Sequence, residues 1–283
     1  MDILFILKAV IIAVVEGITE FIPVSSTGHM ILVGWAIGFK GEFAKMFEVV
    51  IQLGAIMAVV VLYWNKIKDS IVEFFKFIFT KGKKGEKGFK FGINVIIACI
   101  PMGVAGISIY KTIKSKFVPE AVIIGFIVGG LLLIIIENMF RNKTKKVQSI
   151  DEIKPMQAFK VGLFQLLSMW PGMSRSASTI MGGWIGGLST PIAAEFSFFI
   201  AIPAMIGATC KDLFEFDYSI MNLTLWASLI LGFVVAFLVS LVVIKKFIDY
   251  LKRKPMKGFA IYRIIVGSLL GILVLTKVII LTR

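Results

Sequence analysis

The chain has 283 residues, of which 58% are hydrophobic and 17% charged, and its formal net charge is +14. Soluble domains average about 45–50% apolar residues even with glycine included, so a water-soluble fold of this length has too little polar surface to cover its apolar side chains. The composition excludes a soluble enzyme and a disordered chain, and the presence of only two cysteines excludes a disulfide scaffold. A helical protein that crosses a membrane several times remains.

Six stretches are apolar over about 20 residues, the length that crosses a bilayer. They are 44–64, 91–110, 120–140, 191–210, 223–244 and 259–281. Three blocks between them hold most of the positive charge: Lys66 to Lys90, Arg141 to Lys160, and Lys245 to Lys257. Loops rich in Lys and Arg stay in the cytoplasm, so these blocks predict the inner face of the membrane rather than a nucleic-acid surface. The segment around 71–79 is expected to lie along that face as an amphipathic helix, and the linkers 111–119 and 211–222 are expected outside.

Two further apolar stretches, about 3–39 and 158–188, are each broken near the middle by proline, glycine and small hydroxyl residues. The breaks read Pro23-Val-Ser-Ser-Thr-Gly28 and Pro171-Gly-Met-Ser-Arg-Ser176. Each half is too short to span, and the flanking spans place both ends of each stretch on the same side of the membrane. Irregular backbone at membrane depth must be buried in protein or line a polar cavity. The pattern therefore predicts two re-entrant hairpins whose tips meet inside the bundle.

The order of one hairpin followed by three spans occurs twice, with opposite orientation. Positions 149 residues apart match weakly, as Ser25 does with Ser174. The predicted fold is therefore an all-α integral membrane protein of six transmembrane helices and two re-entrant helical hairpins in an inverted-topology repeat. It forms a single membrane domain, 1–283, with a first repeat over 1–141 and a second over 158–283. Such repeats place their site near the midplane, where the broken helices meet.

The first break carries two acids at helical spacing. Glu16 and Glu20 lie one turn apart on one helix face, where their charges repel unless a cation or a proton lies between them. A divalent metal site or an acid–base pair satisfies that need, and a pair of surface carboxylates at a frayed helix is the structural alternative. The first two fit an apolar segment better, because charge inside a membrane is costly.

Hydroxyl groups and a histidine follow directly after those acids. The run is Ser25-Ser26-Thr27-Gly28-His29, and His29 is the single histidine of the chain. A lone histidine is more often structural than functional, but here it shares a short segment with hydroxyls and acids. A base, a hydroxyl and a carboxylate are the parts of an activated nucleophile.

The second break predicts an anion cradle. After the bend at Gly172 a new helix offers N–H groups together with Ser174, Ser176 and Thr179, and Arg175 supplies a permanent charge with two donors in one plane. The structural alternative is a salt bridge between this arginine and an acid of the first break. The two arrangements can alternate, with the acid as partner in the empty site and a phosphate in the loaded one.

Both breaks resemble the signature segments of bacterial undecaprenyl-diphosphate phosphatases, the bacitracin-resistance family. The matching segments are Glu16-Gly-Ile-Thr-Glu20-Phe-Ile-Pro-Val-Ser-Ser26-Thr-Gly-His29 and Pro171-Gly-Met-Ser-Arg175-Ser-Ala-Ser-Thr179. Length, hydropathy pattern and motif positions are similar over essentially the whole chain. The resemblance implies a multi-pass enzyme of the bacterial cell membrane that removes the terminal phosphate of undecaprenyl diphosphate. It also implies a requirement for Mg²⁺ or Ca²⁺ and a site open to the external face.

With that chemistry we expect each site residue to have a specific role. Arg175 with Ser174, Ser176, Thr179 and the N–H groups of the second tip holds the terminal phosphate, and Ser25, Thr27 and Gly172 complete the binding site. Ser26 attacks phosphorus, and His29, or Glu20 beside it, takes the proton. Glu16 and Glu20 bind the divalent cation. Attack by His29 or directly by water stays open as an alternative.

A transporter is the main alternative from another class. Inverted repeats with broken helices are the architecture of secondary carriers, so the chain could move an anionic lipid or phosphate, or combine hydrolysis with lipid flipping. The joint presence of hydroxyl, base, acids and arginine favours the enzyme, because a carrier needs no nucleophile. The partners we expect are the polyprenyl diphosphate substrate, the bilayer and a second copy of the chain, and no nucleic acid.

Overall fold

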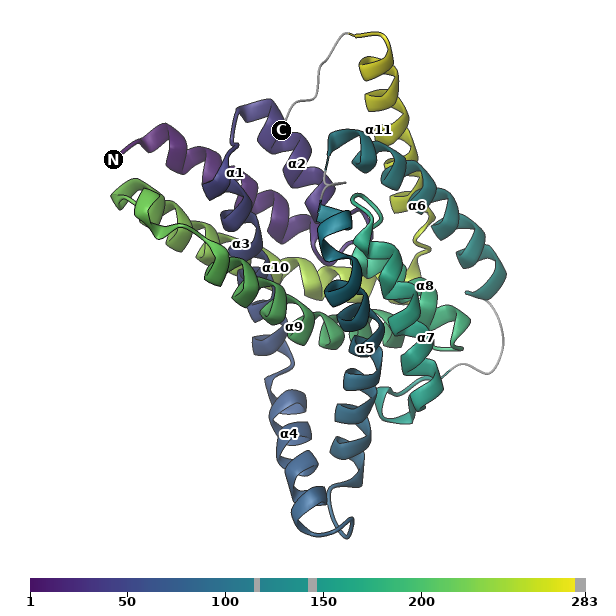
Figure 1. Ribbon diagram of the computed structural model, residues 1–283. Coiled ribbons are helices and arrows are strands. Elements are labelled where there is room, and N and C mark those ends of the chain that lie inside the picture. The colour runs from purple at the N-terminus through teal and green to yellow at the C-terminus, as the bar shows by residue number, and fades with distance from the viewer. Residues whose placement is uncertain (115–117, 142–146, 278–283) are drawn as a thin grey trace.

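The computed structural model describes residues 1–114, 118–141 and 147–277, and within them the chain is helical (Figure 1). Three short 3-10 turns, Ile150–Glu152, Leu166–Met169 and Tyr218–Ile220, connect helices. The described part contains eleven α-helices and no strand longer than one isolated bridge. The helices are α1 Ile3–Thr19, α2 Ser26–Ile37, α3 Glu42–Leu62, α4 Trp64–Phe79, α5 Glu86–Lys114, α6 Pro119–Phe140, α7 Pro155–Gln165, α8 Arg175–Ile185, α9 Thr190–Glu215, α10 Leu223–Arg253 and α11 Lys257–Leu275. The all-α prediction is confirmed.

Six of these helices are long and apolar enough to cross a membrane, namely α3, α5, α6, α9, α10 and α11. They match the six predicted spans, with ends that differ by up to nine residues, the largest difference being at the end of α10. The end of the last predicted span, 278–281, lies outside the described residues, as does part of the linker 111–119. Large apolar side chains remain exposed along the outward faces of α10 and α11, including Leu238 and Leu269. Apolar surface of this extent on the outside of a bundle suits contact with lipid.

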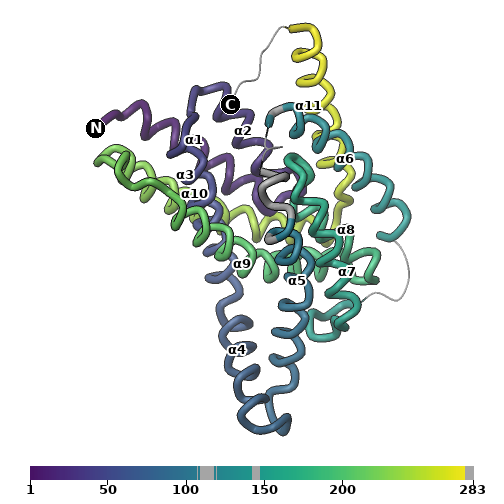
Figure 2. The backbone as a smooth tube through the Cα atoms, viewed as in Figure 1, coloured from purple at the N-terminus to yellow at the C-terminus, as the bar shows by residue number. Residues whose placement is uncertain are grey.

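Four shorter helices fill the two predicted hairpin segments. The first segment divides into α1 and α2, and the second into α7 and α8, at the two expected breaks (Figure 2). With 17, 12, 11 and 11 residues, each is shorter than the about 20 residues that cross a bilayer. Helix α8 is buried on all sides from Ser176 to Trp184, so the second break lies inside the protein.

Contacts between helices of the first and second halves of the chain hold the two halves together. Helix α1 packs against α10, α3 packs against both α9 and α10, α7 packs against α5, and α6 packs against α11. Each broken segment is thus held by helices of the opposite half. This interleaving places the first break beside the second, although 149 residues separate Ser25 from Ser174.

The three basic blocks meet at one end of the bundle. Lys66 pairs with Asp151, and Arg141 Nη2 donates to the carbonyl of Lys254 at 2.9 Å. The chain start lies beside the beginning of α10, where Asp2 N–H donates to the hydroxyl of Thr224 at 3.1 Å.

The predicted helix around 71–79 is present as α4, which extends from the bundle in an antiparallel pair with the first part of α5 (Figure 1). Its apolar face is therefore partly covered by α5, which was not expected for a helix lying alone on a membrane surface.

Candidate active site

Both breaks turn the chain at a serine with a positive φ. Ser25 (φ 73°) precedes α2 and accepts from the N–H of Gly28 at 3.4 Å. Ser174 (φ 70°) precedes α8 and accepts from the N–H of Ala177 at 3.2 Å. A left-handed conformation costs an L residue about 1–2 kcal/mol, and the N-cap hydrogen bonds offset part of that cost. Each tip therefore begins its second helix after a serine whose backbone is strained by a positive φ and whose hydroxyl caps the helix.

Glu20 joins the two tips. Ser26 Oγ donates to Glu20 Oε2 at 2.5 Å, and Arg175 Nη2 donates to Glu20 Oε1 at 3.0 Å. Both Glu20 and Ser26 are buried, each with 6% of its surface exposed. Water screens such a pair poorly, so removing one charge leaves the other without compensation. The residues that the sequence predicted at two separate tips are thus in direct contact.

Helix α9 fixes the plane of the Arg175 guanidinium. Arg175 Nη1 donates to the carbonyl of Ser197 at 2.9 Å and to its hydroxyl at 3.1 Å. Thr179 Oγ1 in turn donates to that hydroxyl at 2.7 Å. Thr179, predicted to bind substrate, here supports the partner of Arg175. Ser197 was missed by the sequence analysis, because a single serine in an apolar span carries no distinguishing signal.

His29 is oriented away from the Ser26 hydroxyl. Its Nδ1 lies 2.8 Å from the carbonyl of Ser25, and its Nε2 lies 2.9 Å from the hydroxyl of Tyr262, whose ring stacks on the imidazole. A carbonyl can only accept, so Nδ1 carries the proton and Nε2 accepts from Tyr262. The hydrogen-bond acceptor of Ser26 is therefore Glu20 and not His29.

Glu16 is fully buried, and within the described residues neither of its carboxylate oxygens has a hydrogen-bond partner. The charges of Glu20 and Glu48 act on it. The described part of the chain contains no cluster of three His, Cys, Asp or Glu residues. Two carboxylates suit a hard cation that takes its remaining oxygen ligands from water and phosphate, as Mg²⁺ does. Glu16 and Glu20 thus fit the predicted cation by charge and by ligand type.

The remaining predicted binding residues surround this centre. Ser174 Oγ and Ser176 Oγ lie 3.2 Å apart, and both are buried. Thr27 lies in the first turn of α2, half-buried. Gly172 has a φ of 87°, and a Cβ there would lie 2.5 Å from the carbonyl of Val122. Its glycine allows the second tip to approach α6, so the structure gives it a role in packing.

Arg263 on α11 is a second arginine at this centre, and the sequence analysis missed it. Its side chain is fully buried and contacts both tips through backbone carbonyls. A charged residue within an otherwise apolar span was the signal that could have found it, because such residues are rare and functional in membranes.

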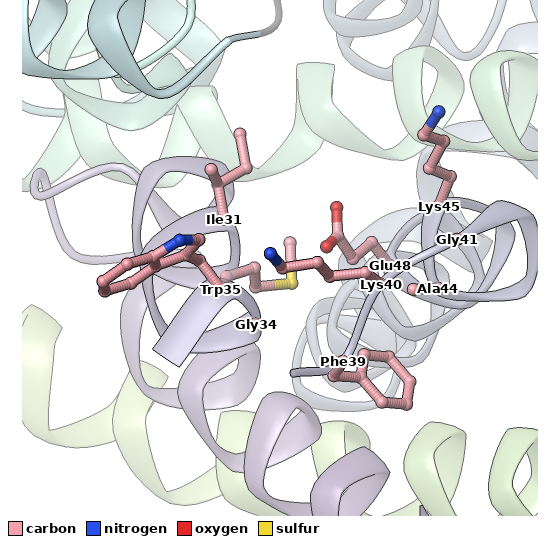
Figure 3. Close-up of a pocket in the computed structure, with 10 residues that line it drawn as sticks. Ile31, Gly34, Trp35, Phe39, Lys40, Gly41, Ala44, Lys45 and Glu48 are labelled. Carbon is pink, nitrogen blue, oxygen red and sulfur yellow. The ribbon is translucent and has the colours of Figure 1, made fainter. Parts of the chain in front are cut away.

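A cavity of about 350 Å³ opens beside this centre, between α2 and α3 (Figure 3). Lys40 extends across it towards Trp35 and Glu48, whereas Lys45 points away from that group. The cavity combines two ammonium groups and a carboxylate with apolar walls. Glu48 therefore borders the cavity while its charge acts on Glu16.

Comparison with known proteins identifies relatives along nearly the whole chain. Residues 9–269 match the family model described as bacitracin resistance protein BacA. A protein of Clostridioides difficile (strain 630) named undecaprenyl-diphosphatase 2 is 66% identical over 99% of this chain and 98% of its own length. Proteins named undecaprenyl-diphosphatase from Clostridium perfringens (strain 13 / Type A) and Clostridium tetani (strain Massachusetts / E88) are 61% and 53% identical, each over 98% of this chain and 99% of their own length.

Proposed function

The chain belongs to the bacitracin resistance protein BacA family, and from this we propose that its two-tip site hydrolyses undecaprenyl diphosphate to undecaprenyl phosphate and inorganic phosphate. It is a multi-pass membrane hydrolase of cell-wall synthesis, because the product is the lipid carrier that this synthesis reuses, and its activity gives resistance to bacitracin. The observation that carries the mechanism is the bonding of Glu20 to both Ser26 and Arg175.

This arrangement suits attack on a phosphate group. Phosphoryl transfer depends mainly on positioning and on stabilising the negative charge of the transferring group. Ser26 offers a hydroxyl with a carboxylate already in place as its proton acceptor, at 2.5 Å. Arg175 is held by Ser197 on one side, while Glu20 occupies its other terminal nitrogen. We expect the terminal phosphate of the substrate to take the place of Glu20 on Arg175, which frees the carboxylate to act as a base.

The reaction follows in two balanced steps. Ser26 Oγ forms a bond to the terminal phosphorus, the bond from that phosphorus to the bridging oxygen breaks, and undecaprenyl phosphate leaves. The Ser26 proton passes to Glu20 Oε2. In the second step a water gives a proton to a carboxylate of the site and attacks the phosphorus of the phosphoserine. The bond from phosphorus to Ser26 Oγ breaks, Glu20 returns its proton to Oγ, and inorganic phosphate leaves. His29 stays a predicted second base, and its Nε2 is engaged by Tyr262 in the present arrangement.

A divalent cation would be held by Glu16 and Glu20. When bound, it neutralises charge on the diphosphate oxygens. The buried Glu16 carboxylate, without a hydrogen-bond partner in the described part of the chain, is the observation that supports this proposal.

Replacing Glu16 by glutamine tests the cation site, because the amide keeps the volume and removes the charge. We expect the Mg²⁺ concentration for half-maximal activity to rise about 10- to 100-fold, the range seen when groups that support a metal site are removed. Metal titrations of phosphate release measure this. Glu215→Gln on α9 is the matched control, because Glu215 is exposed. An unchanged metal dependence in Glu16→Gln would remove Glu16 from the cation site.

We propose that the two halves form an inverted repeat with two re-entrant hairpins. Three equivalences support it, and the two that relate single residues both have an offset of 149 residues. Ser25 and Ser174 cap their helices alike. His29 Nδ1 lies 2.8 Å from the carbonyl of Ser25, and Ser178 Oγ bonds to that of Ser174 at the same distance. Equivalent packing also recurs, because α1 lies on α10 as α7 lies on α5.

We propose further that the site opens towards the external face of the cell membrane. Lys66 pairs with Asp151, and Arg141 binds the carbonyl of Lys254 just after the end of α10, so contacts join the three basic blocks. Loop 38–41 lies near the start of α10 instead, because Phe39 contacts Phe5 and the neighbouring Asp2 bonds to Thr224. If that basic end is cytoplasmic, as the distribution of Lys and Arg predicts, the cavity beside this loop faces outside. Glu48 relates this cavity to the two-tip site, because it borders the cavity and its charge acts on Glu16.

Phosphate release in detergent tests the proposed function against a carrier. Purified protein is mixed with undecaprenyl diphosphate and Mg²⁺ in micelles, where no membrane separates two compartments. An enzyme releases inorganic phosphate in proportion to its concentration, whereas a carrier or flippase leaves the diphosphate intact. Absence of release over a full range of Mg²⁺ and Ca²⁺ concentrations would contradict the proposed function.

A further inference from the structure

Arg263 is the largest polar group of this centre with no role in the mechanism above. It lies on α11, and none of its side-chain surface is exposed. Its Nη2 donates to the carbonyls of Gly125 at 2.9 Å, Gly172 at 2.9 Å and Met173 at 3.1 Å, and its Nη1 donates to that of Pro23 at 3.4 Å. One guanidinium thus binds α6 and the backbone of both tips.

The partners of Arg263 are all backbone carbonyls. Among the described residues no carboxylate forms an ion pair with it. A buried cation without a nearby anion is costly, and acids at the protein surface are too far from Arg263 to form a salt bridge with it. The carbonyl dipoles of the tips therefore compensate its charge. The charge in turn holds these carbonyls in their present orientation.

The bonds to Gly172 and Met173 determine which way the second tip presents its N–H groups. The carbonyl and the N–H of a trans peptide point in opposite directions. The peptide between Met173 and Ser174 directs its carbonyl at Arg263, so the N–H of Ser174 points away from Arg263. Within the described residues this N–H makes no backbone hydrogen bond. Arg175 and Ser176 begin α8 directly after it.

We propose that Arg263 is a positioning residue that holds the Met173–Ser174 peptide with its N–H directed at the terminal phosphate. The inference rests on the proposed function, and it adds a backbone donor and the residue that orients it. With this peptide free to rotate, its carbonyl could face the phosphate and repel it. A fixed N–H of this kind stabilises charge that develops in the transition state.

The space around Arg263 is shaped for a planar group. A Cβ on Gly129 of α6 would lie 1.9 Å from Arg263 Nη2, so this glycine makes room for the guanidinium. A lysine would keep the charge, but an ammonium on a flexible stem cannot bind carbonyls of α6 and both tips at once. The geometry therefore requires both the fork of Arg263 and the absence of a side chain at Gly129.

The test compares Arg263→Lys, Arg263→Met and Gly129→Ala with the wild-type protein. Gly129→Ala keeps the arginine and displaces it, and Gly103→Ala on α5 is the matched control, because a Cβ at Gly103 meets nothing within 4 Å. For each variant one measures kcat and KM for undecaprenyl diphosphate, inhibition by orthovanadate, which mimics the transition state of phosphoryl transfer, and the thermal unfolding temperature in detergent.

We expect kcat to fall about 10²-fold in both Arg263→Met and Gly129→Ala, the usual effect of losing one transition-state donor. KM should change little, and vanadate inhibition should weaken in parallel with kcat. Arg263→Lys should lie between Arg263→Met and the wild type. If the Arg263 variants do not fold, Gly129→Ala alone decides the matter.

Two results would overturn the inference. One is a wild-type kcat in folded Gly129→Ala or Arg263→Met. The other is a loss of kcat with unchanged vanadate inhibition and a lower unfolding temperature, which would make Arg263 a structural brace only. Failure of the proposed function looks different, because then the wild-type protein itself releases no phosphate.

Discussion

Ser26→Ala is expected to lower the rate of phosphate release by at least about 10³-fold, because it removes the attacking oxygen and leaves the rest of the site in place. Undecaprenyl diphosphate should still bind, since Arg175 and the second tip are unchanged. The hydrogen bond from Ser26 to Glu20 is the contact that this variant deletes. Initial rates at saturating lipid, together with a binding titration of the lipid diphosphate, measure both expectations.

Ser228→Ala is the control for the loss of a buried serine hydroxyl. Ser228 on α10 is fully buried, and its hydroxyl donates to the carbonyl of Thr224 at 2.8 Å, remote from both tips. We expect this variant to retain the wild-type rate. Near-normal turnover in Ser26→Ala would remove Ser26 from the role of nucleophile and leave His29 or a water molecule in its place.

Arg175→Lys is the second substitution with a large expected effect, a loss of about 10²-fold in kcat. The lysine keeps a positive charge, but it cannot bind Ser197 and a phosphate in one plane as the guanidinium can. Three hydrogen bonds to Ser197 and Glu20 already occupy both terminal nitrogens of Arg175. Steady-state rates over a range of lipid concentrations separate the expected loss of kcat from a weaker binding of substrate.

Arg141→Lys is the matched control for this change. Arg141 pairs with Glu137 at 3.5 Å and with the carbonyl of Lys254, at the basic end of the bundle. Its replacement by lysine should leave kcat unchanged. Full activity in Arg175→Lys would mean that Arg175 serves only as the ion-pair partner of Glu20, the structural alternative that the sequence also allowed.

The membrane class, the six spans and the two breaks could be predicted from the sequence because local composition determines them. Runs of about 20 apolar residues have few alternatives to crossing a bilayer. Proline and glycine cluster with small hydroxyl residues near Ser25 and Ser174, and such a cluster disfavours a continuous helix. The contact between Glu20 and Arg175 was predicted as one of two alternatives, because a buried charge inside a membrane requires a partner.

The orientations and partners of side chains that depend on tertiary packing could not be predicted from local sequence. His29 shares a short segment with Ser26, yet its ring nitrogens bond to Ser25 and Tyr262. Helical rotation and the packing of α11 decide that orientation, and neither has a local signal. Arg263 was visible as a charge in an apolar span, but its partners are carbonyls from three distant segments. Only the folded arrangement of α6, α11 and the tips brings them together.

The identity of the covalent intermediate tests the mechanism most directly. Undecaprenyl diphosphate with a radioactive terminal phosphate is mixed with the purified protein, and the reaction is quenched during the first turnover. We expect acid-stable label on the peptide that contains Ser26, and none in Ser26→Ala. Acid-labile label would place the phosphate on His29 instead. Release of phosphate in the first turnover with no labelled protein would mean direct attack by water, and either result would contradict a phosphoserine at the junction of the two tips.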